Sequence, residues 1–326
     1  MRVLILVLLV TVFCINLYAQ TEKNMSNIND FKYNLKLIKF YIEKYEYDNA
    51  LEYIDITLEE AIEKDSLFYY KAFIYEELED WLQASEFFAK AILHSSEEKV
   101  IDELLTDFEV AIVHVSPLSA FDIVSAAVAN AQNTQKHVGF LSILARLYES
   151  NQLYGEANDV YRTILLETEE SKSYNLQIKI ATNNIFQKDY EEALNILEPL
   201  ITLDDSLYIE KLLFLNYIAN ISLEYYENAK ISLIRLYLDF PEHTNREEIL
   251  AGLADIFKHQ EQYLMSWYML NELFKISDEA RRFKIQNDIE RIKEMICESN
   301  TIEDQFRYFI PIIEYEKQRL SPDDIK

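Results

Sequence analysis

The chain has 326 residues, half of them hydrophobic, but only 3 glycines and 5 prolines, where average usage would give roughly 20 and 15. Tight hairpins and phosphate-binding loops need glycine, so these counts favour helices joined by short polar turns, and the hydrophobic content excludes global disorder. The net charge of −26 disfavours nucleic acid and anionic lipid as ligands and favours a basic partner.

The chain begins with an apolar run, "MRVLILVLLVTVFCINLYA". This pattern predicts a signal peptide over residues 1–19, cleaved after Ala19. An uncleaved membrane anchor is the rival interpretation, but the run is short for a span of about 20 residues. A lipid-attachment site at Cys14 is disfavoured because Phe13 stands where a small residue is needed. We therefore expect an exported protein with no integral membrane span, either periplasmic, envelope-associated or secreted.

A polar segment, residues 20–29, follows and is predicted to be flexible. From residue 30 to residue 275 a small residue recurs at a nearly constant spacing of 34 to 37 residues. Its members are Ala50, Ala84, Ala120, Ala157, Ala193, Ala229 and Ser266. A constant period in this range predicts a solenoid built from two-helix units.

Other columns support the same alignment. Three residues before each small residue, six of seven positions are aromatic, whereas a chain that is 13% aromatic would give about one. Four residues after it, all seven positions are apolar, and twelve residues before it, four of seven are alanine. Small residues allow two helices to approach closely, and the rings and leucines fill the space between successive units.

This pattern resembles the tetratricopeptide repeat. The clearest match is the second unit, with Phe68, Ala72, Tyr75, Trp81, Ala84, Phe88 and Ala91, and the sixth unit adds the closing proline as Pro241. The resemblance implies an all-α solenoid of about seven helix pairs over residues 30–275. It also implies a protein-interaction scaffold. Residues 238–275 are similar to repeats in bacterial outer-membrane assembly and Tol–Pal-associated envelope proteins.

Helix boundaries and the chain end complete this prediction. Ser116 and Pro117 read as an N-cap followed by the first helical residue, and Pro199 should end or kink a second helix. Residues 276–320 fit the repeat poorly and read as two C-terminal capping helices, "DEARRFKIQNDIERIKEMICES" and "TIEDQFRYFIPIIEYEKQ". After signal cleavage Cys297 is the single cysteine left, and we expect it to be buried and inert.

No catalytic, cofactor-binding or metal-binding motif is present. No two of the five histidines lie within four residues of each other, and there is no nucleophile elbow or P-loop. We therefore expect a protein that is not an enzyme and needs no cofactor. An enzyme with an unrecognised site remains an alternative, and it would require a cleft of convergent carboxylates.

The repeat resemblance implies that the first helix of each pair lines a concave groove. The residues expected there as a protein-binding site are Tyr69, Phe73, Glu76, Arg146, Phe186 and Phe214. Such rings and charges suit a protein or an extended peptide, with the partner favoured to be basic. A glycan or peptidoglycan-binding module and a periplasmic holdase are the other hypotheses, and the sequence does not specify the oligomeric state.

Overall fold

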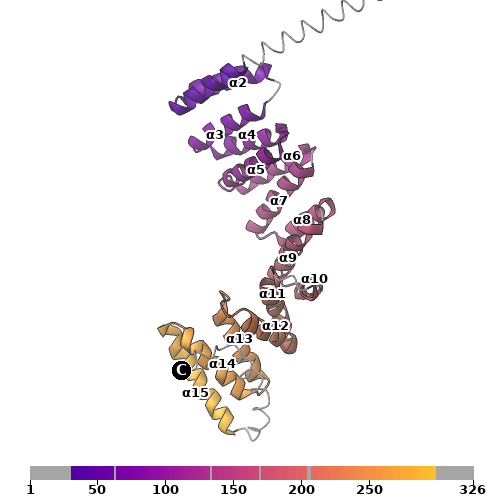
Figure 1. Ribbon diagram of the computed structural model, residues 1–326, viewed down its shortest axis with the longest axis vertical. Coiled ribbons are helices and arrows are strands. Elements are labelled where there is room, and N and C mark those ends of the chain that lie inside the picture. Colours follow the sequence, from indigo (N-terminus) through magenta and orange to yellow (C-terminus); the bar gives the residue numbers. More distant parts are fainter. Residues whose placement is uncertain (1–30, 62–63, 133, 169, 204–206, 299–326) are drawn as a thin grey trace, which may run out of the picture. The chain divides into compact units, whose positions relative to one another are not determined.

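The computed structural model describes residues 31–61, 64–132, 134–168, 170–203 and 207–298, and these residues form helices joined by turns. The predicted signal peptide, the flexible segment 20–29 and the second capping helix lie outside the described residues. After the helical residues 31–43, the helices in chain order are α2 Tyr47–Glu60, α3 Asp65–Glu77, α4 Trp81–His94, α5 Glu98–Ile112, α6 Pro117–Asn130, α7 Thr134–Ser150, α8 Tyr154–Glu167, α9 Glu170–Phe186, α10 Tyr190–Thr202, α11 Ile209–Ser222, α12 Tyr226–Asp239, α13 Arg246–His259, α14 Tyr263–Ile276 and α15 Glu279–Glu298 (Figure 1).

The helices form seven consecutive pairs plus α15, in two compact units. The first unit ends at Lys172, in the first turn of α9, and the second begins at Ser173. Consecutive helices pack together from α2 to α5, from α6 to α8 and from α10 to α15, and α4 also packs on α6 and α5 on α7. The predicted all-α solenoid of helix pairs is thus confirmed.

The column of small residues lies at the centre of each pair. All seven members, from Ala50 to Ser266, are at most 1% exposed. The apolar column four residues later is also buried, and so is the column twelve residues earlier. The aromatic column has a separate role, because its members from Tyr47 to Tyr263, with Pro117 in the third pair, are the first residues of the second helices.

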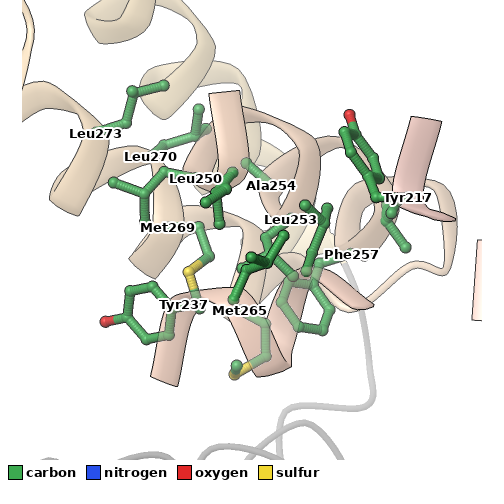
Figure 2. Packing of buried hydrophobic residues seen from close by; sticks show 14 of the residues in the cluster. Tyr217, Tyr237, Leu250, Leu253, Ala254, Phe257, Met265, Met269, Leu270 and Leu273 are labelled. Carbon is green, nitrogen blue, oxygen red and sulfur yellow. The ribbon is translucent and has the colours of Figure 1, made fainter. Parts of the chain in front are cut away.

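One large residue, in the column twelve positions before the small residue, is accommodated by a neighbouring glycine. Tyr217 replaces the usual alanine in α11, and Gly252 of α13 lies against its ring: a methyl group on Gly252 would be 2.8 Å from Tyr217 Oη and 2.9 Å from Leu233 Cδ1. Both Tyr217 and Leu233 belong to the largest buried cluster of the second unit, where side chains of α11, α12, α13 and α14 meet (Figure 2).

Six of the seven turns within a pair share one backbone geometry. The residue two positions before each second helix has a positive φ near 60°, and none of these residues is glycine: Tyr45, Glu79, Gln152, Lys188, Glu224 and Glu261. In the second pair, the Glu79 N–H donates to Glu76 O at 2.9 Å and the Asp80 N–H donates to Tyr75 O at 2.8 Å. This double hydrogen bond is the Schellman motif, which normally selects glycine at the left-handed position.

The third pair uses a different turn. Ser116 Oγ accepts a hydrogen bond from the Ser119 N–H at 3.4 Å, and Pro117 is the first residue of α6, as predicted. Pro199 lies inside α10, which ends one turn later at Thr202, in agreement with the expected helix end.

The C-terminal helix α15 caps the second unit. It packs on α14 and buries Ile285, Ile289 and Ile292 at 7%, 3% and 1% exposure, so the first predicted capping helix is present. The expectation for Cys297 is wrong, since its side chain is exposed. The reason is helical periodicity: Cys297 is five residues beyond Ile292, so it falls on a different face of α15 from the isoleucines.

Gly252→Ala should destabilise the second unit. Alanine gains about 1 kcal/mol of helix propensity, but its methyl group would overlap the fixed Tyr217 ring, and overpacking costs about 1–3 kcal/mol. We expect a net loss in the free energy of urea unfolding. Adding Tyr217→Phe removes the hydroxyl and should recover part of this loss, whereas additive effects of the two substitutions would contradict the proposed contact.

Lys188→Gly should stabilise the chain. A side chain in the left-handed region costs about 1–2 kcal/mol, and glycine removes this cost while adding some entropy to the unfolded state. We expect a gain of up to about 1 kcal/mol in urea unfolding. Gln187→Gly, one residue earlier and without a positive φ, is the matched control and should not stabilise.

Candidate protein-binding faces

Each unit has a surface formed by the first helices of successive pairs, here called the first-helix face. In the first unit α3 contributes Tyr69, Phe73 and Glu76, which are four and three residues apart and therefore share one side of the helix. All three side chains are half-buried. Asp107 of α5 is also half-buried and acts electrostatically on both Tyr69 and Glu76, so α3 and α5 bring these groups together.

The carboxylates of this face are held in an unfavourable environment. Burial, followed by the charges of Asp107 and Glu77, raises the pKa of Glu76. Burial and the charge of Glu103 raise the pKa of Asp107. Burial and then Asp107 raise the pKa of Tyr69. No Lys or Arg contributes to any of these three shifts. The face therefore carries an excess of negative charge that a cation would relieve.

Arg146, predicted to be part of the site, lies on the next first helix and has a different contact. Its Nε is 2.5 Å from Glu109 Oε1 of α5. Phe108 and Ala145 occupy the same column, twelve residues before the small residue of their repeats. Glu109 and Arg146 each follow that column by one residue, so the ion pair joins equivalent positions of two successive helix pairs. This ion pair therefore links the first helices α5 and α7 across the first-helix face.

The two predicted phenylalanines belong to the second unit and differ in exposure. Phe186 is the last residue of α9 and is 59% exposed. Phe214 is half-buried, and its ring centroid lies 6.0 Å from that of Tyr217 and 5.4 Å from that of His243. Phe214 thus contributes to the packing of the second unit, whereas Phe186 is available to solvent.

The second unit has a groove that the sequence analysis missed. It has a volume of about 670 Å³, and α13, α14 and α15 line it with Glu248, Asp255, Leu273, Lys284 and Asp288 among others. Asp255 directly follows Ala254, just as Phe73 follows Ala72 and Arg146 follows Ala145. The repeat alignment could therefore have identified Asp255 as a residue of the same column. Asp288 lies on α15, outside the repeat, where no column was available.

The groove resembles the face of the first unit in its electrostatics. Burial is the main cause that raises the pKa of Asp255, and Asp288 raises it further, while Lys258 and Lys284 oppose the shift. Burial, then Glu248 and Asp255, raise the pKa of Tyr217. In the second unit, Glu248 and Asp255 of α13 thus act on Tyr217 of α11, and Asp288 of α15 acts on Asp255.

The described part of the chain contains no group of three or more His, Cys, Asp or Glu side chains placed to hold a metal ion. Among the same residues, no helix has the length and apolar character needed to cross a bilayer.

Comparison with known proteins gives similarities of fold. No protein-family profile matches the sequence, and no curated protein matches it either. A tetratricopeptide repeat protein from Parabacteroides merdae is 14% identical, with a TM-score of 0.46 over 74% of this chain and 96% of its own. The C-terminal part of a repeat-containing protein from Cytophaga hutchinsonii is 11% identical, with a TM-score of 0.47 over 77% and 98%. The apo form of RapI is 17% identical, with a TM-score of 0.48 over 86% of each chain.

The fold is an α-solenoid of tetratricopeptide-like helix pairs. With all three TM-scores under 0.5, this assignment rests on the chain itself: its period of 34 to 37 residues, its two-helix units and its buried small columns.

Replacing the two carboxylates of the first face should stabilise the first unit at neutral pH. Folding raises the pKa values of Glu76 and Asp107, so between the ordinary and the raised values the folded chain binds more protons than the unfolded chain. Stability therefore falls as pH rises through this window, and the cost is fully present above it. The double variant Glu76→Gln with Asp107→Asn should therefore lose the decrease in stability that these two carboxylates cause as the pH rises.

Urea unfolding at about pH 4 and about pH 7 measures this effect, because the ordinary carboxyl pKa values lie near the lower pH. The double variant should exceed the parent in stability at the higher pH and lose most of this advantage at the lower pH. Asp122→Asn with Glu156→Gln, two exposed carboxylates of α6 and α8, is the control for the same change of net charge. An equal gain in the control would contradict a local origin.

Proposed function

We propose that the chain is a non-enzymatic scaffold that binds a basic, extended segment of a partner protein along its first-helix faces. The observation that carries this proposal is the pair Glu76 and Asp107, two half-buried carboxylates whose pKa values are raised by burial and by neighbouring acids. A lysine or arginine of the partner would neutralise both, and Tyr69 beside them offers a ring for its aliphatic stem.

The two units would act as two contact regions for one partner or for two. The groove of the second unit offers carboxylates together with Lys284, and its leucines provide apolar contact. Arrays of helix pairs suit extended ligands because each pair adds a similar increment of surface. We further propose that the protein is exported to the bacterial cell envelope, supported by the apolar run at residues 1–19 and by the resemblance of residues 238–275 to repeats of envelope proteins.

The test is a crosslinking pull-down with the tagged chain, expressed in the cells that produce it, followed by mass spectrometry. We expect one or two proteins in stoichiometric amounts. Because the variant removes the charges that attract a cation, Glu76→Gln with Asp107→Asn should lower their recovery by about tenfold. The charge-matched control, Asp122→Asn with Glu156→Gln, should leave recovery unchanged.

Other outcomes would overturn the proposal in distinct ways. Many weakly bound proteins, recovered equally by the variant, would indicate a holdase. Retained glycan without protein would indicate a glycan-binding module. Recovery of the chain from the cytoplasmic fraction alone would contradict the proposed export without bearing on the binding face.

A further inference from the structure

A second surface of the first unit is both apolar and acidic. It lies at the turns within the second and third pairs and exposes Leu78 at 49%, Leu82 at 42%, Val113 at 64% and Leu118 at 76%. These four residues are here called the apolar edge. The two turns lie side by side, because the rings of Trp81 and His114 stack with their centroids 4.3 Å apart.

The fold does not require leucine at these positions. Leu82 and Leu118 occupy the same place in their repeats, two residues before the small column. The corresponding residues in the first, fourth, fifth and sixth pairs are Asp48, Gly155, Glu191 and Glu227, and the seventh pair has a half-buried leucine, Leu264. Exposed apolar side chains at equivalent places of adjacent units form a patch of the kind that marks an interaction site.

The spacing of the two leucines suits a helix. Because α4 and α6 pack directly on each other, Leu82 and Leu118 are separated by about one interhelical distance, roughly 8–10 Å. Residues i and i+7 of a helix are about 10.5 Å apart along its axis. A partner helix with an apolar stripe could therefore contact both leucines with two residues of one face that are two turns apart.

Charge determines which helix can bind. Residues 72–89 contain five acidic residues and residues 100–135 contain another five, and neither stretch has a Lys or Arg. Three of these acids, Glu77, Glu79 and Asp80, are exposed and alternate with Leu78 and Trp81 at the edge itself. Nucleic acid, anionic lipid and a second copy of the same edge would all be repelled.

We propose that the apolar edge docks a basic amphipathic helix of a partner protein. Its leucines or other apolar side chains contact Leu82, Val113 and Leu118, and its lysines or arginines face Glu77 and Glu79. This surface consists of turn residues, whereas the first-helix face consists of Tyr69, Glu76 and Asp107. The leucines of the edge can therefore be altered without changing the first-helix face, whereas Glu77 lies next to Glu76 and acts on it.

Fluorescence anisotropy with a labelled peptide of about 18 residues tests this proposal, the peptide having leucines at i, i+3, i+4 and i+7 and lysines elsewhere. The full chain should bind the peptide, and added salt should weaken binding. Leu82→Ser with Leu118→Ser should raise the dissociation constant by about tenfold or more, because both apolar anchors are lost. Glu77→Gln with Glu79→Gln should weaken binding and reduce its salt dependence.

The controls separate this surface from others. Leu166→Ser removes a leucine of α8 that is 89% exposed but distant in sequence from the edge, and it should leave binding unchanged. Glu76→Gln with Asp107→Asn should also have little effect, so a failure here is distinct from a failure of the first-helix proposal. Unchanged binding by the Leu82 and Leu118 variant would overturn the inference. A dimer in light scattering that this variant dissociates would also overturn it, because a second copy would then cover the edge.

Discussion

The burial of one small residue in the second helix of every pair is the constraint on which the rest of this structure depends. A residue no larger than serine occupies this position in all seven pairs, from Ala50 to Ser266, and none is more than 1% exposed. A small side chain allows a neighbouring helix to approach closely, and the larger buried side chains of successive pairs form a continuous core. Tyr217 occupies a position that is alanine in most repeats, and the next first helix has a glycine, Gly252, against its ring. The packing volume is thus conserved between neighbours, although it is not conserved at each position.

The same arrangement separates stability from recognition. Second helices and buried columns supply the core, which leaves the exposed positions of the first helices and of the turns free to vary between repeats. In the first unit these positions hold Glu76 and Asp107 on one face and Leu82 and Leu118 at one edge, at a local cost of charge repulsion and exposed apolar surface. A protein that only had to fold would have little reason to keep either feature.

Much of the fold could be predicted from the sequence, because periodicity alone identifies the buried columns and the start of each second helix. Helical spacing also places Tyr69, Phe73 and Glu76 on one side of α3, while their role in binding stays a prediction. Asp107 was not predicted, because a single acid in an amphipathic helix does not reveal how deeply its carboxylate is buried. The left-handed turns could not be predicted, because glycine is the residue that marks such turns in a sequence, whereas here Glu79 and Lys188 adopt them. The burial of Cys297 was predicted wrongly, because its exposure depends on which face of α15 packs against α14.

The six left-handed turns have a consequence for cooperativity. Each stores backbone strain within a single pair, which lowers the intrinsic stability of that pair and leaves the interfaces between pairs unaffected. In a linear array, helix pairs of low intrinsic stability that have strong interfaces unfold together. Helix pairs of high intrinsic stability with the same interfaces unfold one at a time. The non-glycine turns therefore lengthen the stretch of chain that behaves as one cooperative block, so that a partner holding one pair in place also holds its neighbours.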